Sequence, residues 1–357
     1  MATWTKELVL EALKEVNDPD LGKDLVTLGM IDKVEVSEAG VEFTIVLTTP
    51  ACPLKGVMER DARQALQRHF PDLGDGQIRV CFDAQTRSDN RISEQLSLPI
   101  KNILAVSSGK GGVGKSSVTV NLALALAQSG AKVGILDADI YGPNVNIMLG
   151  NSSMPTVAVE RKDEQGDENP ILAPAFLHGI HAMSIGYLVE SGQALAWRGP
   201  MLHGILRQLL LDTEWPDLDY LLIDMPPGTG DIQLSIPTLC PVTAAIVVSS
   251  PQKVALSDTR RGITAFGQLK VPILGLIENM AGEVFGRGGG EAAAKEMGLP
   301  FLGRIELDAA IRDGGDRGCP IVLFEAESSS AKAFVEIAGK IAARLAVRHV
   351  NRQDGEI

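Results

Sequence analysis

Residues 109–116, GKGGVGKS, have the types and spacing that can hold the phosphates of a nucleotide. Glycines let backbone N–H groups converge on phosphate oxygens, and a helix that begins directly after them adds a favourable dipole. Lys115 is expected to reach the β- and γ-phosphates, and the Ser116 hydroxyl to complete a Mg²⁺ shell. The predicted nucleotide-binding residues of this motif are Gly109, Lys110, Gly111, Gly112, Val113, Gly114, Lys115, Ser116 and Ser117.

Carboxylates stand at the ends of two further apolar runs. Asp224 follows the run at residues 220–223 and is predicted to hold Mg²⁺ through its water shell. Asp137 and Asp139 follow the run at 133–136, and one of them could orient an attacking water while the other serves the metal shell. Gly228 and Gly230 would allow the loop after Asp224 to sense the γ-phosphate.

The pattern around these motifs predicts an α/β domain. Short apolar runs at residues 103–106, 133–136, 220–223, 244–248 and 273–277 have strand length, and helical patterns such as 118–127 lie between several of them. Continuous apolar strands that alternate with helices are typical of a parallel sheet buried on both faces. We therefore expect a P-loop NTPase domain over residues 99–350, with a mostly parallel sheet flanked by helices, and a tail at 351–357.

The first 84 residues have a different pattern, which predicts a small α+β domain. Apolar residues at helical spacing indicate a helix near residues 8–16 and another at 55–68, and strands are expected at 30–36, 41–47 and 78–82. Residues 85–98 contain almost no large apolar side chains and are predicted to be a linker. Within the larger domain, the polar stretch 159–170, VERKDEQGDENP, is expected to be an exposed loop.

The composition excludes several classes of protein. With 357 residues, of which 45% are hydrophobic, the chain can bury the cores of about two domains without disulfides or a structural metal. The net charge of −12 argues against nucleic acid as the main partner. Apolar runs fall far short of the roughly 20 residues of a membrane span, and four unclustered cysteines suit a reducing compartment, so we expect a cytoplasmic protein without membrane attachment.

Lys110 makes the phosphate motif similar to that of the deviant Walker-A ATPases, the class of nitrogenase iron protein, MinD and ParA. The resemblance implies a homodimer in which Lys110 crosses to the ATP of the partner subunit and neutralises charge there, as an arginine finger does. It also implies that Asp139 positions the attacking water. Lys110, Lys115 and Asp139 are thus the expected catalytic residues, Ser116, Asp224 and Asp137 the expected Mg²⁺ residues, and hydrolysis should be slow and coupled to a conformational change.

Residues 137–144, 197–201, 224–231 and 278–280 resemble, more narrowly, the Mrp (ApbC-like) family of iron–sulfur cluster carrier ATPases. In this class the Asn of the last stretch contacts adenine, so Asn279 is expected to contact the base of ATP. Residues 18–20, 28–31 and 48–54 resemble the small iron–sulfur assembly domain that precedes the ATPase in many bacterial Mrp proteins. The implied function is ATP-driven assembly or transfer of iron–sulfur clusters, with apoproteins or assembly factors as partners.

One departure from that family concerns the cluster ligands. Many Mrp proteins carry a C-x-x-C soon after the Asn-Met of the adenine loop, and two such pairs hold a [4Fe–4S] cluster between subunits. Residues 279–290, NMAGEVFGRGGG, contain no cysteine. Cys52, in a loop before a predicted helix whose dipole would favour the thiolate, is the candidate thiol site. The alternative function is a MinD/ParA-like switch that recruits a partner and carries no cluster.

Overall fold

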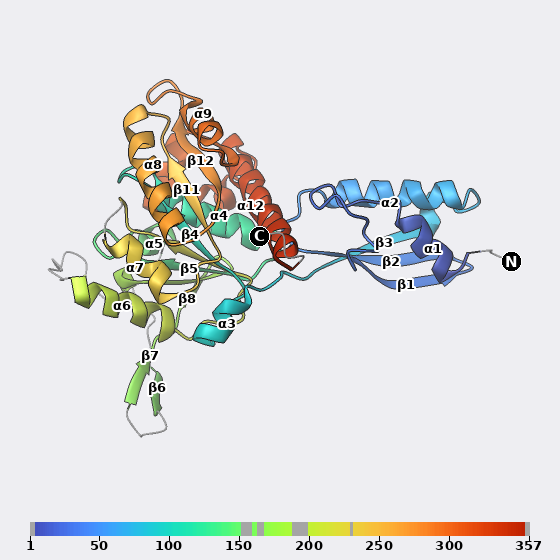
Figure 1. Ribbon diagram of the computed structural model, residues 1–357, viewed down its shortest axis with the longest axis horizontal. Helices are drawn as coiled ribbons and strands as arrows, with labels where there is room; N and C mark the ends of the chain where they lie inside the picture. The colour runs from blue at the N-terminus through green and yellow to red at the C-terminus, as the bar shows by residue number, and fades with distance from the viewer. Residues whose placement is uncertain (1–3, 151–158, 163–167, 188–198, 229–230, 354–357) are drawn as a thin grey trace. The chain divides into compact units, whose positions relative to one another are not determined.

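The computed structural model describes residues 4–150, 159–162, 168–187, 199–228 and 231–353 (Figure 1). Contacts between residues divide the chain into two compact units, one formed by residues 1–87 and 339–357 and the other by residues 88–338. The last helix, α12 (Ser329–Gln353), contributes residues to both units. Each unit has an apolar core of its own.

The N-terminal residues form a three-stranded sheet with two helices, as predicted. The sheet has the order β1-β2-β3, with β1 and β2 antiparallel and β2 and β3 parallel. Alternate residues of the central strand, Val41, Phe43, Ile45 and Leu47, are buried in the core together with apolar residues of both helices. The elements are α1 (Lys6–Leu13), β1 (Ile31–Ser37), β2 (Gly40–Leu47), α2 (Lys55–His69) and β3 (Ile78–Ala84).

The larger unit is built on an eight-stranded sheet of order β13-β12-β11-β4-β10-β5-β9-β8. All neighbouring strands are parallel except β8 and β9, so the expected mostly parallel sheet is confirmed. The strands are β4 (Ile103–Ser107), β5 (Val133–Asp137), β8 (Ala175–Leu177), β9 (Ile180–Ser184), β10 (Tyr220–Asp224), β11 (Ala244–Ser249), β12 (Ile273–Ala281) and β13 (Phe301–Glu306).

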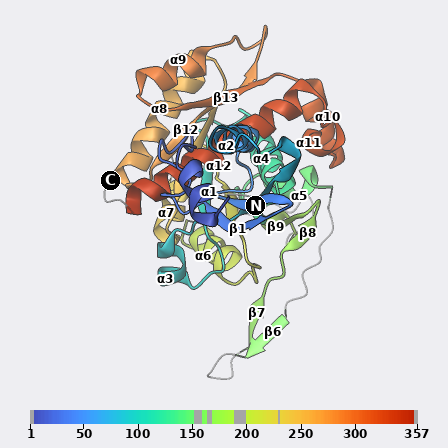
Figure 2. The same cartoon turned by 90° about the vertical axis from the view of Figure 1, so that its right-hand side faces the viewer.

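Helices cover both faces of this sheet (Figures 1 and 2). Apolar side chains of α3 (Asn90–Leu96), α6 (Gly199–Leu211), α7 (Asp231–Leu239) and α8 (Lys253–Gln268) share one core with the central strands. Helix α4 (Lys115–Gln128) packs against β5 and β10, and right-handed crossovers place it on the opposite face from α7. The remaining helices are α5 (Val145–Met148), α9 (Gly289–Glu296), α10 (Ala309–Arg317) and α11 (Ile321–Phe324). Among the described helices, none is long and apolar enough to cross a bilayer.

Two predicted irregular segments contain regular structure. Residues 85–98, predicted to be a linker, include helix α3, and its Ile92 is fully buried in the core of the larger unit. Leu96 and Leu98 pack against the same core, so three apolar residues spaced along a polar stretch attach it to the larger unit. Residues 159–170, predicted to be a loop, include β6 (Val159–Lys162) and β7 (Glu168–Ile171), which pair as antiparallel strands.

The strand order determines where the polar strand ends meet. Strand β10 lies between β4 and β5, and its last residue, Asp224, pairs with Val106 of β4 and with Asp137 of β5. Because parallel strands end at the same edge of a sheet, the loops that follow these three strands come together there. The phosphate motif and the predicted metal carboxylates therefore share one edge of the sheet.

A close contact between two glycines provides a stability prediction. Gly318, which ends α10, has φ +68°, and a Cβ atom there would lie 2.1 Å from the Cα of Gly150. Gly318→Ala should lower the free energy of unfolding by about 3 kcal/mol, because backbone strain and a backbone clash add. The matched control is Gly298→Ala, where φ is +66° and nothing lies within 4 Å, which should cost only about 1 kcal/mol. Urea unfolding of both variants measures the difference, and equal losses would contradict the role of the contact.

Candidate nucleotide and metal site

The phosphate motif forms a loop between β4 and α4, as its sequence predicts. Gly112 and Gly114 both have φ +79°, a backbone conformation that favours glycine. Gly114 is the N-cap residue of α4, and among the described residues no side chain caps the first turn of that helix. The backbone N–H groups of this turn therefore face the loop, where they can bind phosphate oxygens.

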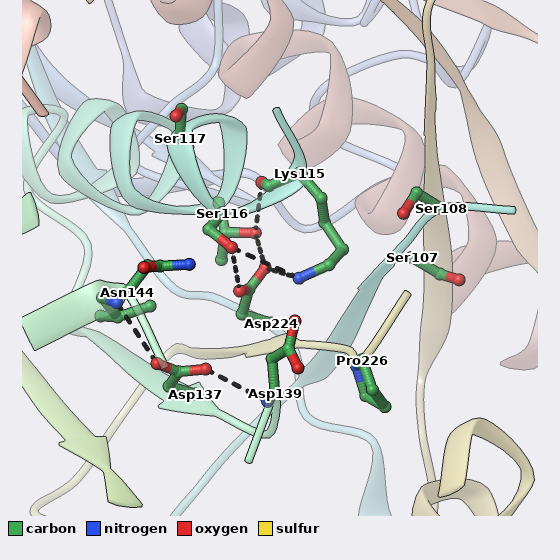
Figure 3. A network of polar contacts seen from close by, with 12 residues as sticks. Ser107, Ser108, Lys115, Ser116, Ser117, Asp137, Asp139, Asn144, Asp224 and Pro226 are labelled. Atoms are coloured by element: carbon green, nitrogen blue, oxygen red, sulfur yellow. Dashed lines mark hydrogen bonds and ion pairs between the residues drawn. The ribbon is translucent and has the colours of Figure 1, made fainter. Parts of the chain in front are cut away.

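The Asp224 carboxylate joins the end of β10 to the first turns of α4 (Figure 3). Its oxygens lie 2.7 Å from Nζ of Lys115 and 2.6 Å from Oγ of Ser116. Thr119, one helical turn after Lys115, donates its hydroxyl to the same carboxylate at 2.7 Å. Asp224 is fully buried and Lys115 nearly so, and a buried carboxylate requires such partners. Asp224, Lys115 and Ser116 therefore lie together, as the sequence predicted.

Asp137 lies beside this cluster at the end of β5. Its carboxylate accepts hydrogen bonds from the backbone N–H of Asp139 and Val145 and from the hydroxyl of Ser184 at the end of β9. Burial and the nearby Asp224 carboxylate raise the pKa of Asp137 to about 7. Asp137 is completely buried, lies next to Asp224 and holds the loop after β5 in place.

Asp139 and Lys110 are more accessible than this cluster. Asp139 is half-buried, and its desolvation raises the pKa of the carboxyl group. Its side chain lies near Asp224 in Figure 3, with the carboxylate pointing away from Asp137. The Lys110 residue is exposed, and its backbone carbonyl accepts a hydrogen bond from Oγ of Ser108. The structure therefore leaves the side chain of Lys110 exposed to solvent.

A cavity next to the phosphate loop has room for a base. Its volume is about 250 Å³, and it is lined by Gly114, Ser117, Met148, Asn279, Met280, Glu306, Leu307, Asp308, Ile311, Arg312, Gly315 and Asp316. The Asn279 Nδ2 group donates to the carbonyl of Val113 in the phosphate loop at 2.8 Å. This bond leaves the Oδ1 atom of Asn279 to accept a hydrogen bond, so an exocyclic amino group is its natural ligand.

Glu278 precedes Asn279 on β12 and holds the loop that follows this strand. Its fully buried carboxylate accepts hydrogen bonds from the backbone N–H of Gly288 and Gly290 and from Nε of Arg304. The loop between β12 and α9 is also closed by two backbone hydrogen bonds of 2.8 Å between Gly282 and Gly286. In place of a cluster-binding loop with cysteines, this chain thus has a short loop held by its backbone and by Glu278.

Cys52 does not have the activated thiol that its sequence position suggested. The side chain is half-buried, and this burial raises the pKa of the thiol, with the Asp18 and Asp20 carboxylates adding to the effect. Backbone N–H groups of Leu54 and Lys55 oppose the rise without reversing it. The expectation that a helix dipole favours the thiolate is therefore wrong, because desolvation and negative charge outweigh it. Among the described residues, no group of three or more His, Cys, Asp and Glu could hold a metal ion.

Three residues of the site were missed in the sequence. Thr119 could have been found from its spacing, because a residue four positions after Lys115 lies on the same helix face. Ser184 on Asp137 and Gln233 near Ser107 could not, because both contacts cross between distant strands and helices. Trp197, Arg198, Thr229 and Gly230, which belong to the stretches that resembled the Mrp family, lie outside the described residues.

The fold and the site define a P-loop NTPase of the ParA/MinD type. Residues 99–342 match the model of the NUBPL iron-transfer P-loop NTPase family, and residues 6–80 match that of iron–sulfur cluster assembly proteins. The chain therefore belongs to the NUBPL iron-transfer P-loop NTPases and carries an N-terminal iron–sulfur assembly-type domain, which confirms the resemblance noted in the sequence.

Full-length relatives and solved structures agree with this family. The chain is 46% identical over 355 residues to an iron–sulfur cluster carrier protein from a Synechocystis species, covering 96% of this chain and 98% of that protein. The carrier protein of Escherichia coli is 47% identical over 69% of this chain and 67% of its own.

Among solved structures, a nucleotide-binding protein from Archaeoglobus fulgidus in complex with ADP matches with TM-score 0.54 and 32% identity, over 69% of this chain and 96% of its own. The cell division ATPase MinD of Pyrococcus furiosus matches with TM-score 0.53 and 29% identity, over 67% of this chain and 98% of its own.

The raised pKa of Asp137 predicts a pH-dependent stability. Between about pH 4 and 7 the folded chain keeps a proton on Asp137 that the unfolded chain releases, so the free energy of unfolding falls as pH rises through this range. Asp137→Asn should remove this contribution. Between pH 5.5 and 7.5 the free energy of unfolding of the wild type should fall by roughly 1–2 kcal/mol relative to that of the variant. Urea unfolding without nucleotide or Mg²⁺ at both pH values tests this, and parallel profiles would contradict it.

Proposed function

We propose that the protein binds and hydrolyses ATP as a homodimer and uses this cycle to assemble or transfer iron–sulfur clusters to apoproteins in the cytoplasm. The observation that carries the ATPase part is the buried cluster of Lys115, Ser116 and Asp224 at the phosphate loop. The cargo is supported by the carrier proteins that the chain resembles over nearly its full length. Apo iron–sulfur proteins and assembly factors are the proposed partners.

The residues of the site fit Mg²⁺ and a triphosphate. Ser116 Oγ and the Asp224 carboxylate are 2.6 Å apart and both offer the oxygen ligands that Mg²⁺ prefers. Lys115 would bind the β- and γ-phosphates, and Ser116 and Asp224 would hold the ion, with Asp137 beside them. The bound Mg²⁺ neutralises charge on the phosphates. Asp139 orients the water that attacks the γ-phosphorus.

The cavity beside Asn279 supports adenine as the base. Because Nδ2 of Asn279 is bonded to Val113, its Oδ1 atom accepts the N6 amino group of adenine, whereas guanine presents a carbonyl oxygen there. Met280, Leu307 and Ile311 supply apolar surface for the ring.

Asn279→Ala should reduce discrimination between adenine and guanine nucleotides. We expect the affinity for ADP to fall roughly tenfold while that for GDP changes by less than about threefold, because only adenine loses a hydrogen bond. Isothermal titration of both nucleotides measures the two constants. Leu307→Ala, which removes apolar area without changing base hydrogen bonds, is the control and should weaken ADP and GDP binding alike. Equal losses of ADP and GDP binding in Asn279→Ala would exclude the proposed base contact.

The two lysines of the phosphate loop should have separable roles. Lys115→Ala should abolish ATP binding, because the phosphate charge loses its buried partner. Lys110→Ala should keep ATP binding within about threefold and lower turnover by roughly 10³-fold, since an arginine-finger-like group in trans acts only in the transition state. Steady-state turnover and equilibrium ATP binding of both variants provide the measurements.

Turnover of Lys110→Ala at the wild-type rate would remove Lys110 from the mechanism. A mixture of Lys110→Ala with a binding-defective Lys115→Ala chain is a further control. Mixed dimers should hydrolyse ATP in the intact phosphate loop of the Lys110→Ala chain, because the Lys115→Ala partner supplies its Lys110. Absence of such complementation would argue that Lys110 acts within its own subunit.

The cluster function is tested by anaerobic reconstitution with iron and sulfide, followed by iron counting and visible absorbance. We expect the wild type to bind iron and sulfide in cluster form and Cys52→Ser to lose part of it, because the usual C-x-x-C is missing from residues 279–290. Cys240→Ser is the matched control, since Cys240 is buried in the ATPase core. Cluster binding unaffected by Cys52→Ser would place the ligands elsewhere.

The missing C-x-x-C also favours a second candidate function. If the wild type binds no iron while a protein partner stimulates its ATPase, the protein is an ATP-driven switch or an assembly factor whose cluster resides on another protein.

A further inference from the structure

The side chain of Gln233 connects three parts of the nucleotide site. Gln233 lies in the first turn of α7 and is only 4% exposed. Its amide nitrogen, Nε2, is 2.8 Å from Oγ of Ser107, 3.0 Å from the carbonyl of Pro226 and 3.4 Å from the carbonyl of Ser108. One side-chain amide thus bonds both the beginning of the phosphate loop and the loop that follows Asp224.

The acceptors of Gln233 lie at the start of the phosphate loop and in the loop that follows Asp224. Ser107 is the last residue of β4, and Ser108 is the first residue of the phosphate loop. Pro226 is two residues after Asp224, in the loop that leads toward Gly228. The N–H of Gly228 donates to the carbonyl of Ser108 at 3.1 Å. The loop after Asp224 is therefore bonded to the phosphate loop twice, once through its backbone and once through Gln233.

Packing alone does not explain a glutamine at this position. Another residue of the same helix, Ile236, packs into the apolar core of the domain. A buried amide is unfavourable unless its hydrogen bonds are made, and an apolar side chain of similar size would avoid that penalty. The glutamine is therefore explained by its hydrogen bonds to Ser107 and Pro226, which connect two loops and do not stabilise the helix itself.

We propose that Gln233 is a positioning residue of the ATPase: it holds residues 225–228 against the phosphate loop in the arrangement that accepts a γ-phosphate. Because the same side chain belongs to α7, a displacement of that loop when the γ-phosphate leaves is transmitted to this helix, which packs against α6. The role differs from that proposed for Lys115 or Ser116, because the Gln233 amide bonds Ser107, Ser108 and Pro226 and would act through the two loops. This inference rests on the proposed ATPase function.

The test compares nucleotides with and without a γ-phosphate. For Gln233→Leu we expect ADP affinity within about twofold of the wild type, a loss of AMP-PNP affinity of about fivefold or more, and a turnover lowered at least about tenfold. The matched control is Thr243→Val. Thr243 is equally buried and accepts the N–H of Ile103 at the opposite end of β4, so its loss should leave the ratio of AMP-PNP to ADP affinity unchanged.

A second variant separates positioning from simple destabilisation. In Gln233→Glu the ionised carboxylate faces the carbonyls of Pro226 and Ser108 and repels them, whereas the protonated acid can donate one hydrogen bond. The turnover of this variant relative to the wild type, measured at each pH between 5.5 and 8.5, should rise as pH falls. A structural role alone would give a constant ratio in a folded protein.

The outcomes distinguish a failure of the proposed ATPase function from a failure of the proposed role of Gln233. Wild-type protein that hydrolyses no ATP would overturn the proposed function and this proposal with it. Hydrolysis by the wild type with unchanged turnover in Gln233→Leu would overturn only the role of Gln233. Equal losses of ADP and AMP-PNP affinity in Gln233→Leu would also reject the role of Gln233. So would a turnover of Gln233→Glu, relative to the wild type, that does not vary with pH.

Discussion

The arrangement of the nucleotide site depends on one buried carboxylate, Asp224. Its oxygens bond Lys115, Ser116 and Thr119, so a fully buried negative charge is matched by one ammonium and two hydroxyl groups. The same contacts join the end of β10 to the first turns of α4. Removal of a single partner would leave the buried charge unmatched in a low-dielectric environment, so these contacts hold the phosphate loop beside the end of β10.

In the proposed mechanism, Lys115 would bind phosphate and Ser116 would bind Mg²⁺. Both side chains are bonded to Asp224 in this structure, so nucleotide binding would exchange these partners. Thr119 lies deeper and can stay on the carboxylate throughout. Such an exchange couples nucleotide to the loop after β10, whose first residues follow Asp224 directly and which is bonded to the phosphate loop through Gly228 and Gln233. In the proposed mechanism, a change at the γ-phosphate would reach helix α7 through these hydrogen bonds.

The segment after Asn279 is where the sequence departs from the Mrp resemblance. Glu278 and Arg304 hold the segment between β12 and α9 by side-chain and backbone hydrogen bonds, and no cysteine occurs in residues 279–290. The bonds that hold this segment are therefore made by backbone groups and by the Glu278 and Arg304 side chains.

The sequence alone determined the chemistry of the phosphate loop, since Lys115 and Ser116 act through local spacing between a strand and a helix. It also located Asp224 and Asp137, because strand ends are visible as breaks in apolar runs. It could not show that β10 lies between β4 and β5, and only this order brings Asp224 to Lys115 and Asp137. The contacts of Ser184 and Gln233, and the burial of Ile92 and Cys52, were decided by tertiary structure. These contacts join residues far apart in the chain, so desolvation and pairing there depend on packing that no local pattern records.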